Sequence, residues 1–249
     1  GSFYEVDAVD GWFIATQYDI PWRHDIFSDN YFGETAQCIE FKRRGYKCVV
    51  ANQIEPWLAL TVENFSLDEP SRLKFLEEYS ADIYPLVSII IPTFNRPKFF
   101  QEALESALNQ TYRHFEIVIS DDGTNDETEQ LIQPYLEKYP CIKYFRNRGF
   151  ISHDNWNFLR AYNNPDAEYV HWLLDDDLWY PRKLEIGVEI YRNNPDVSLV
   201  AHVVANIDTA GNVINYHAPQ RIVGDKLKID GDEAGRNFFM YNNSSFDIL

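Results

Sequence analysis

Cysteine, long apolar runs and glycine-rich loops are all scarce in this sequence, and each scarcity excludes a class of protein. Only Cys38, Cys48 and Cys141 occur, and they are too scattered for a disulfide framework or a zinc site. We therefore expect free thiols in a reducing compartment. No stretch approaches the ~18 apolar residues that cross a membrane, and no signal peptide is recognisable, so we expect a cytoplasmic chain without a membrane span.

Positive charge is also in short supply. Lys and Arg number 22 against 39 Asp and Glu, which leaves a net charge of −17. This balance argues against a nucleic acid as partner, because phosphate backbones attract Lys and Arg. A phosphorylated substrate would also be repelled unless a divalent cation neutralised it locally. The absence of a glycine-rich phosphate loop argues against a nucleotide triphosphatase or a dehydrogenase.

Apolar and aromatic residues, in contrast, are abundant, at 45% and 16% of the 249 residues. This composition is typical of a globular chain with one large domain or a domain and a half. From Leu86 onward, short apolar runs alternate with segments of helical periodicity. Strands are expected at 87–91, 115–120, 142–145, 169–174 and 197–206, and helices at 97–108, around 131–136, at 155–162 and at 182–191. Such alternation predicts an α/β fold whose mostly parallel sheet is flanked by helices.

The first 84 residues follow another pattern, which predicts a small α+β appendage. Strands are expected at 12–16 and 46–50, and a helix at 34–44 should end at Gly45. Residues 51–84 are interpreted as a helical linker with a short helix at 71–79. The domain that carries the α/β alternation is therefore expected to occupy residues 85–249.

Polar and acidic residues follow three of the predicted strands, at 92–95, 121–123 and 175–177. Because the carboxyl ends of parallel strands lie at one edge of a sheet, these loops are expected to line a single ligand site. The three carboxylates at 175–177 would repel one another without a cation, and their hard oxygen atoms suit Mn²⁺ or Mg²⁺ bound together with substrate phosphates. Two alternatives stay open: a solvated acidic loop at 175–177, and a turn with a helix cap at 121–123.

Four segments between residues 85 and about 220 stand out by their order and spacing. They are Val87-Ser-Ile-Ile-Ile-Pro-Thr-Phe-Asn-Arg, Ala107-Leu-Asn-Gln-Thr-Tyr, Phe115-Glu-Ile-Val-Ile-Ser-Asp-Asp-Gly and Leu174-Asp-Asp-Asp-Leu-Trp-Tyr-Pro. Together they resemble the family 2 glycosyltransferases of the GT-A fold. The resemblance implies an inverting, metal-dependent transferase that uses a nucleotide-diphospho sugar, with a UDP-sugar as the expected donor.

The resemblance also implies the site residues. The nucleotide would be bound by Pro92, Thr93, Asn95, Asp121, Asp122, Asn157 and Asp175. The metal, Mn²⁺ or Mg²⁺, would be bound by Asp176 and Asp177 of the DXD-type motif. One departure is Leu174, which stands where the family often has the first Asp of this motif.

The N-terminal part carries a second resemblance. Segments 9–16, 19–23 and 40–50 resemble the acceptor-side, C-terminal part of a glycosyltransferase-like domain. Residues 3–50 are therefore interpreted as the end of an upstream domain, which implies that the chain belongs to a larger polypeptide.

The catalytic base is left unidentified by the sequence. In family 2 enzymes an acidic residue, normally in a Glu-Asp context after the metal motif, deprotonates the acceptor hydroxyl. No Glu-Asp pair follows Asp177, and we expect the acceptor half and the base beyond Leu249. The chain should then bind the donor but turn over poorly. A bolder hypothesis offers Glu34 or Glu40 of the N-terminal segment as the base.

The function expected from the resemblance is sugar transfer to a glycan or another hydroxyl acceptor, as in polysaccharide biosynthesis. The alternative is a non-catalytic donor-binding or scaffolding module of a multi-domain glycosyltransferase. A nucleotidyltransferase of related fold is disfavoured, because residues 93–98 lack the glycines of its phosphate loop. Trp179 is a candidate for lining the sugar pocket, whereas Trp172 is expected in the core.

Overall fold

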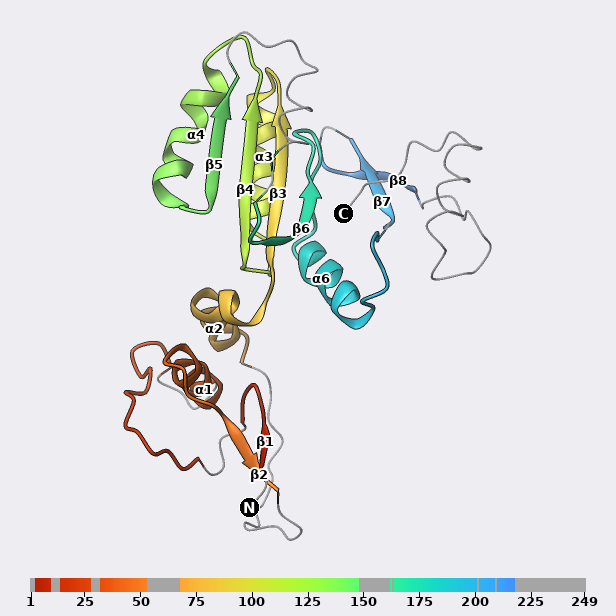
Figure 1. Cartoon of the computed structure of the whole chain (residues 1–249). Helices are drawn as coiled ribbons and strands as arrows, with labels where there is room; N and C mark the ends of the chain where they lie inside the picture. Colours follow the sequence, from red (N-terminus) through yellow and green to blue (C-terminus); the bar gives the residue numbers. More distant parts are fainter. Residues whose placement is uncertain are drawn as a thin grey trace. The chain divides into compact units, whose positions relative to one another are not determined.

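The computed structural model describes residues 3–9, 14–27, 32–52, 68–147, 162, 164–200, 202–208 and 210–217. The chain divides into two compact units, one up to Tyr84 and one from Pro85 onward (Figure 1). Most of the predicted helix at 155–162 and the start of the predicted strand at 12–16 lie outside the described residues.

In the first unit, two short strands pair and two helices pack together. β1 (Phe3–Glu5) and β2 (Val49–Ala51) are antiparallel. α1 (Gly33–Arg43) contacts α2 (Glu69–Ile83), the helix that the sequence analysis placed in a linker. The core of this unit consists of Phe27, Ala36, Ile39, Phe75, Leu76 and Tyr79. Both helices contribute to it, so α2 packs into the first unit.

Glu40 of α1 is buried at the centre of an ion-pair network. Its carboxylate accepts hydrogen bonds from Arg43 at 3.1 Å, from Arg44 at 2.8 Å and from the hydroxyl of Tyr79 at 3.1 Å. Burial by itself raises the pKa of Glu40, but the hydrogen bonds from Arg44 and Tyr79 outweigh it, so the pKa lies below its ordinary value. A carboxylate with a lowered pKa is a weak general base, so the network favours a structural role for Glu40. Glu34 lies in the first turn of α1, where a carboxylate favours the helix dipole.

The second unit is built on a parallel sheet whose described strands have the order β5-β4-β3-β6 (Figure 1). β3 (Leu86–Thr93) and β4 (Phe115–Asp121) lie at its centre, and β5 (Ile142–Arg146) and β6 (Ala167–Trp172) lie at its sides. The central strands are buried almost throughout, because in a parallel sheet both faces are covered. This burial explains why both strands are mainly apolar in the sequence.

Helices α3 (Pro97–Leu108), α4 (Glu127–Lys138) and α6 (Lys183–Asn193) alternate with these strands. The apolar residues of α3 recur with helical spacing, and four of them, Phe100, Ala103, Leu104 and Ala107, are buried on one face. The predicted α/β class, a parallel sheet flanked by helices with a small N-terminal α+β part, is confirmed. None of the helices in the described ranges is long and apolar enough to cross a bilayer.

One predicted strand was placed wrongly. Among the described residues of the expected range 197–206, those from Val204 onward form a strand, β7 (Val204–Ile207). It pairs with β8 (Val213–His217) in an antiparallel hairpin. The turn chemistry decides this pairing: Asp208 accepts the backbone N–H groups of Ala210 and Asn212, each at 2.9 Å. Gly211 adopts φ 82°, which glycine tolerates without a steric penalty. Hydrophobic periodicity alone did not reveal this turn.

The buried His171 of β6 is expected to make the stability of the fold sensitive to acid. It is 1% exposed, its ring centroid lies 4.2 Å from that of Trp179, and burial, helped by nearby Lys183, lowers its pKa to about 2. The unfolded chain binds a proton at His171 below about pH 6.5 while the folded chain does not, so stability falls as the pH drops below that value. We expect a loss of about 1.4 kcal/mol per pH unit from this group.

Urea unfolding of the wild type and of His171→Leu at pH 7 and pH 5, followed by tryptophan fluorescence, checks this expectation. The stability difference between the two pH values should be smaller in the variant by about 2 kcal/mol. Comparing the two pH values cancels the packing cost of the substitution itself. Equal pH dependence in both proteins would contradict the prediction.

Candidate functional site

The acidic loop after β6 is fastened to the end of β3. The carboxylate of Asp175 accepts hydrogen bonds from the hydroxyl of Thr93 at 3.0 Å and from the backbone N–H of Phe94 at 3.3 Å. Thr93 is 2% and Asp175 7% exposed. Burial raises the pKa of Asp175, although the bonds from Thr93 and Phe94 act in the opposite direction. Asp175 therefore joins two strand ends that are 82 residues apart in the sequence.

The loop after β3 is also fastened to the loop after β4. The side-chain oxygen of Asn95 accepts the backbone N–H of Thr124 at 2.8 Å, and its Nδ2 donates to the hydroxyl of Thr124 at 3.0 Å. Asn95 holds a left-handed backbone with φ 54°, which asparagine tolerates better than most residues. The N–H of Asp122 donates to the carbonyl of Thr93 at 3.1 Å. The three strand ends thus lie together at one edge of the sheet, as the α/β alternation predicted.

Asp121, the last residue of β4, points into the protein and is 0% exposed. One carboxylate oxygen accepts the N–H of Gly123 at 2.7 Å, and the other accepts the hydroxyl of Tyr144 at 2.6 Å and forms an ion pair with Arg146. A Cβ at Gly123 would lie 2.8 Å from the Asp121 oxygen, so a larger residue here would displace this carboxylate. These contacts make Asp121 an internal anchor of the loop.

Asp122 lies next to the end of β5 and is 4% exposed. The Nδ2 of Asn147 donates to its carboxylate at 2.9 Å and to the hydroxyl of Ser120 at 2.6 Å. The backbone N–H of Asn147 donates to the carbonyl of Asp121 at 2.9 Å. Asn147 therefore orients the Asp122 carboxylate at the same edge of the sheet.

Asp176 is half-exposed and is paired with a cation from another loop. The guanidinium of Arg96 donates to Asp176 at 2.6 Å and to Asp175 at 3.3 Å. Asp177 is exposed, and its backbone N–H donates to the carbonyl of Leu174 in the turn.

The donor set at this loop fits a divalent cation. In the part of the chain that the structure describes, no three His, Cys, Asp or Glu side chains converge as a metal-binding group. Two neighbouring carboxylates that already hold a guanidinium nevertheless suit Mg²⁺ or Mn²⁺, which commonly bind one or two carboxylates and complete their coordination with phosphates and water. The cation would therefore depend on the substrate for part of its coordination.

The remaining predicted residues lie in different parts of the chain, and one of them is outside the described residues. Pro92 lies within buried β3, opposite Ser120 of β4. Asn157 lies outside the described residues. Trp179 is 8% exposed, and its ring packs against that of His171.

Four residues of the site were missed by the sequence analysis: Arg96, Thr124, Arg146 and Asn147. The sequence contains a signal for two of them, because Arg146 and Asn147 lie at the end of β5 just as Asp121 and Asp122 lie at the end of β4. Arg96 and Thr124 lie within or beside recognised motifs. Their hydrogen-bond partners, Asp176 and Asn95, are far away in the chain, so local patterns do not reveal these contacts.

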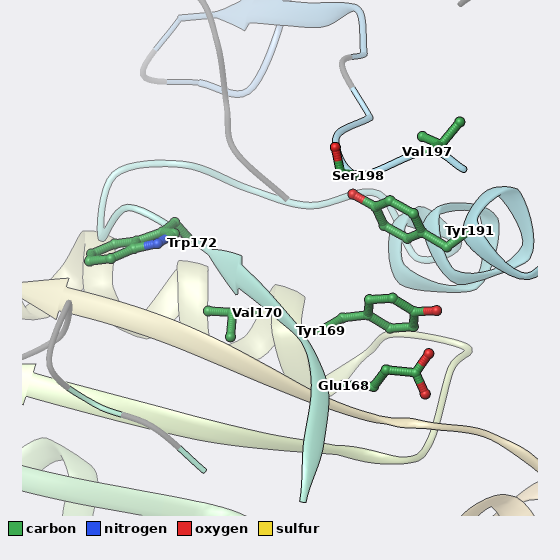
Figure 2. Close-up of a pocket in the computed structure, with 7 residues that line it drawn as sticks. All are labelled: Glu168, Tyr169, Val170, Trp172, Tyr191, Val197 and Ser198. Carbon is green, nitrogen blue, oxygen red and sulfur yellow. The ribbon is translucent and has the colours of Figure 1, made fainter. Parts of the chain in front are cut away.

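A hollow lies along β6, apart from these three loops. This open pocket has a volume of about 320 Å³ and is lined by Glu168, Tyr169, Val170, Trp172, Tyr191, Val197 and Ser198. Figure 2 shows the rings of Tyr169 and Tyr191 facing each other, and their centroids lie 4.9 Å apart. The lining residues come from β6, α6 and the segment that follows α6.

Comparison with known proteins adds two family matches. The model described as "Glycosyl transferase family 2" matches residues 88–247, and the model described as "Glycosyltransferase like family" matches residues 1–79.

Individual relatives match over part of the chain. An uncharacterized glycosyltransferase of Rickettsia typhi is 38% identical over 148 residues, which cover 58% of this chain and 45% of the relative. The GalNAc(5)-diNAcBac-PP-undecaprenol beta-1,3-glucosyltransferase of Campylobacter jejuni is 36% identical over 158 residues, 63% of this chain and 48% of that protein. The chain thus spans less than half the length of these two relatives.

Among solved structures, a mannosyltransferase of Pyrobaculum calidifontis in complex with GDP-Man and Mn²⁺ is 24% identical, with a TM-score of 0.40. The similarity covers 49% of this chain and 36% of that one.

Proposed function

Because the chain belongs to glycosyl transferase family 2, we propose that it transfers a sugar from a nucleotide-diphospho sugar to a hydroxyl acceptor. The proposed donor is a UDP-sugar, the proposed acceptor is a glycan, and the proposed cation is Mn²⁺ or Mg²⁺. The proposed reaction inverts the configuration at the anomeric carbon of the transferred sugar. The glucosyltransferase name of the Campylobacter jejuni relative supports sugar transfer as the reaction class.

The observation that carries the proposal is the meeting of three strand ends. Thr93 of β3 bonds to Asp175 after β6, and the carbonyl of Thr93 accepts the N–H of Asp122 after β4. In open α/β sheets, ligands bind beyond the carboxyl ends of the strands. The strand ends therefore present buried and half-exposed carboxylates at the place where such a sheet binds its ligand.

Each part of the edge has a proposed role. Pro92 and Thr93 at the end of β3, and Asn95 in the loop that follows, border the base. Asp122 accepts hydrogen bonds from the uracil N–H or the ribose. Asp121 acts indirectly, because its buried contacts with Gly123 and Arg146 hold the loop in place. In the same proposal, residues 85–249 bind the donor.

The acidic residues 175–177 hold the diphosphate end of the donor in this proposal. A divalent cation bound by Asp176, with Asp175 and Asp177 beside it, would neutralise the charge that develops on the departing nucleoside diphosphate. Asp175 is oriented for this task by Thr93 and the N–H of Phe94, so its carboxylate is fixed before the donor arrives.

Calorimetric titration with UDP, GDP, CDP and ADP, each with Mn²⁺ and with EDTA, tests the proposal. We expect UDP to bind most tightly and Mn²⁺ to strengthen its binding about tenfold or more, because the cation and the diphosphate share one site. Binding of UDP with Mn²⁺ but no transfer to any glycan acceptor would favour the donor-binding module over the transferase. A chain that binds none of these nucleotides with Mn²⁺ would refute the donor assignment.

A further inference from the structure

Two arginines pair with aspartates at this edge of the sheet, and their surroundings differ sharply. The Arg146–Asp121 pair is almost completely buried, with side-chain exposures of 11% and 0%. The Arg96–Asp176 pair is half-exposed, at 50% and 48%. A buried ion pair costs several kcal/mol to break, whereas an exposed pair contributes only about 0–1 kcal/mol. Arg146 is therefore a permanent partner, while Arg96 can exchange its partner.

Arg96 also lies where an anion would bind. It is the N-cap residue of α3, directly before Pro97, so the positive end of the helix dipole lies beside it. Its guanidinium has five N–H donors in a planar fork that matches two phosphate oxygens at once. The same guanidinium now bridges Asp175 and Asp176. Asp176 is the proposed ligand of the cation that would hold the diphosphate, and Asp175 lies beside it.

We propose that Arg96 is an exchangeable counter-ion, which neutralises Asp175 and Asp176 in the nucleotide-free chain and turns to the donor diphosphate when a divalent cation binds these carboxylates. This inference rests on the proposed function. It makes Arg96 a competitor of the free cation and a ligand of the nucleotide. The nucleotide draws Arg96 away from the carboxylates, which leaves them open to the cation. The cation in turn occupies the carboxylates, which leaves Arg96 open to the nucleotide. Each ligand therefore strengthens the binding of the other by the same factor.

Titration of Mn²⁺ alone, followed by the electron paramagnetic resonance signal of free Mn²⁺, tests the first half of the proposal on the whole chain. Arg96→Gln should bind Mn²⁺ about threefold more tightly than the wild type, since a competing exposed ion pair has been removed. Calorimetric titration of UDP at saturating Mn²⁺ tests the second half. There, Arg96→Gln should bind UDP about tenfold more weakly, because a charged hydrogen-bond donor to the diphosphate is lost.

Lys138→Gln is the matched control. It changes the net charge by the same amount, in the last turn of α4, away from the strand ends. It should leave both affinities unchanged. Arg96→Lys keeps the charge without the planar fork and should fall between the wild type and Arg96→Gln in UDP affinity.

The outcomes separate this inference from the proposed function. Equal Mn²⁺ affinity in the wild type and Arg96→Gln, or an equal gain in Lys138→Gln, overturns the counter-ion role. Weaker Mn²⁺ binding in Arg96→Gln also overturns it, since Arg96 would then support the carboxylates. A wild type that binds Mn²⁺ but no nucleotide refutes the proposed function, and the Mn²⁺ titration still decides whether Arg96 shields the carboxylates.

Discussion

Replacing Asp176 with asparagine is expected to weaken Mn²⁺-dependent UDP binding about 10- to 100-fold, the range found when a metal site loses a supporting carboxylate. The side chain keeps its size, but it loses the charge that attracts a divalent cation. Binding of UDP in EDTA should change little, because the substitution removes no proposed contact with the base or the ribose. Calorimetric titration with and without Mn²⁺ measures both quantities.

Folding should be unaffected by this change, because Asp176 is half-exposed and its pair with Arg96 is of the exposed kind. Glu189→Gln, which removes one exposed carboxylate charge from α6, is the matched control and should retain wild-type UDP affinity with Mn²⁺. If Asp176→Asn kept the full effect of Mn²⁺ on UDP binding, the metal assignment at this loop would be wrong.

Asp121→Ala is expected to destabilise the fold by about 3–5 kcal/mol, which is the cost of leaving a buried charge without its partner. The guanidinium of Arg146 is 11% exposed and pairs with the Asp121 carboxylate, and the N–H of Gly123 and the hydroxyl of Tyr144 donate to the same group. Removing the carboxylate leaves all three donors without this acceptor. Urea unfolding of the wild type and the variant measures the difference.

Asp121→Asn provides a second test if the alanine variant fails to fold. The amide oxygen can still accept from Gly123, so the loss of stability should be smaller than for alanine. Asp176→Ala serves as the contrast, because it removes a neighbouring carboxylate that is half-exposed, and it should change stability little. Equal stability losses in Asp121→Ala and Asp176→Ala would contradict the distinction between a buried anchor and an exposed ligand.

Local patterns in the sequence were sufficient for most of the fold of the second unit. The apolar runs of β3 and β4 and the i, i+3, i+4, i+7 face of α3 depend on residues close together in the chain, so their periodicity can be read directly. The hairpin of β7 and β8 was missed because its turn depends on the side chain of Asp208 and on Gly211, which apolar periodicity does not include.

The sequence by itself determined that acidic residues follow parallel strands and must gather at one edge of the sheet. Only the tertiary structure decided what each aspartate does there. Asp121 and Asp176 look alike in the sequence. In the structure, Asp121 is buried together with Arg146, whereas Asp176 is solvent-exposed and pairs with Arg96, 80 residues away. Burial and ion pairing arise between segments that are distant in the chain, and a pattern with a period of two or 3.6 residues carries no information about such partners.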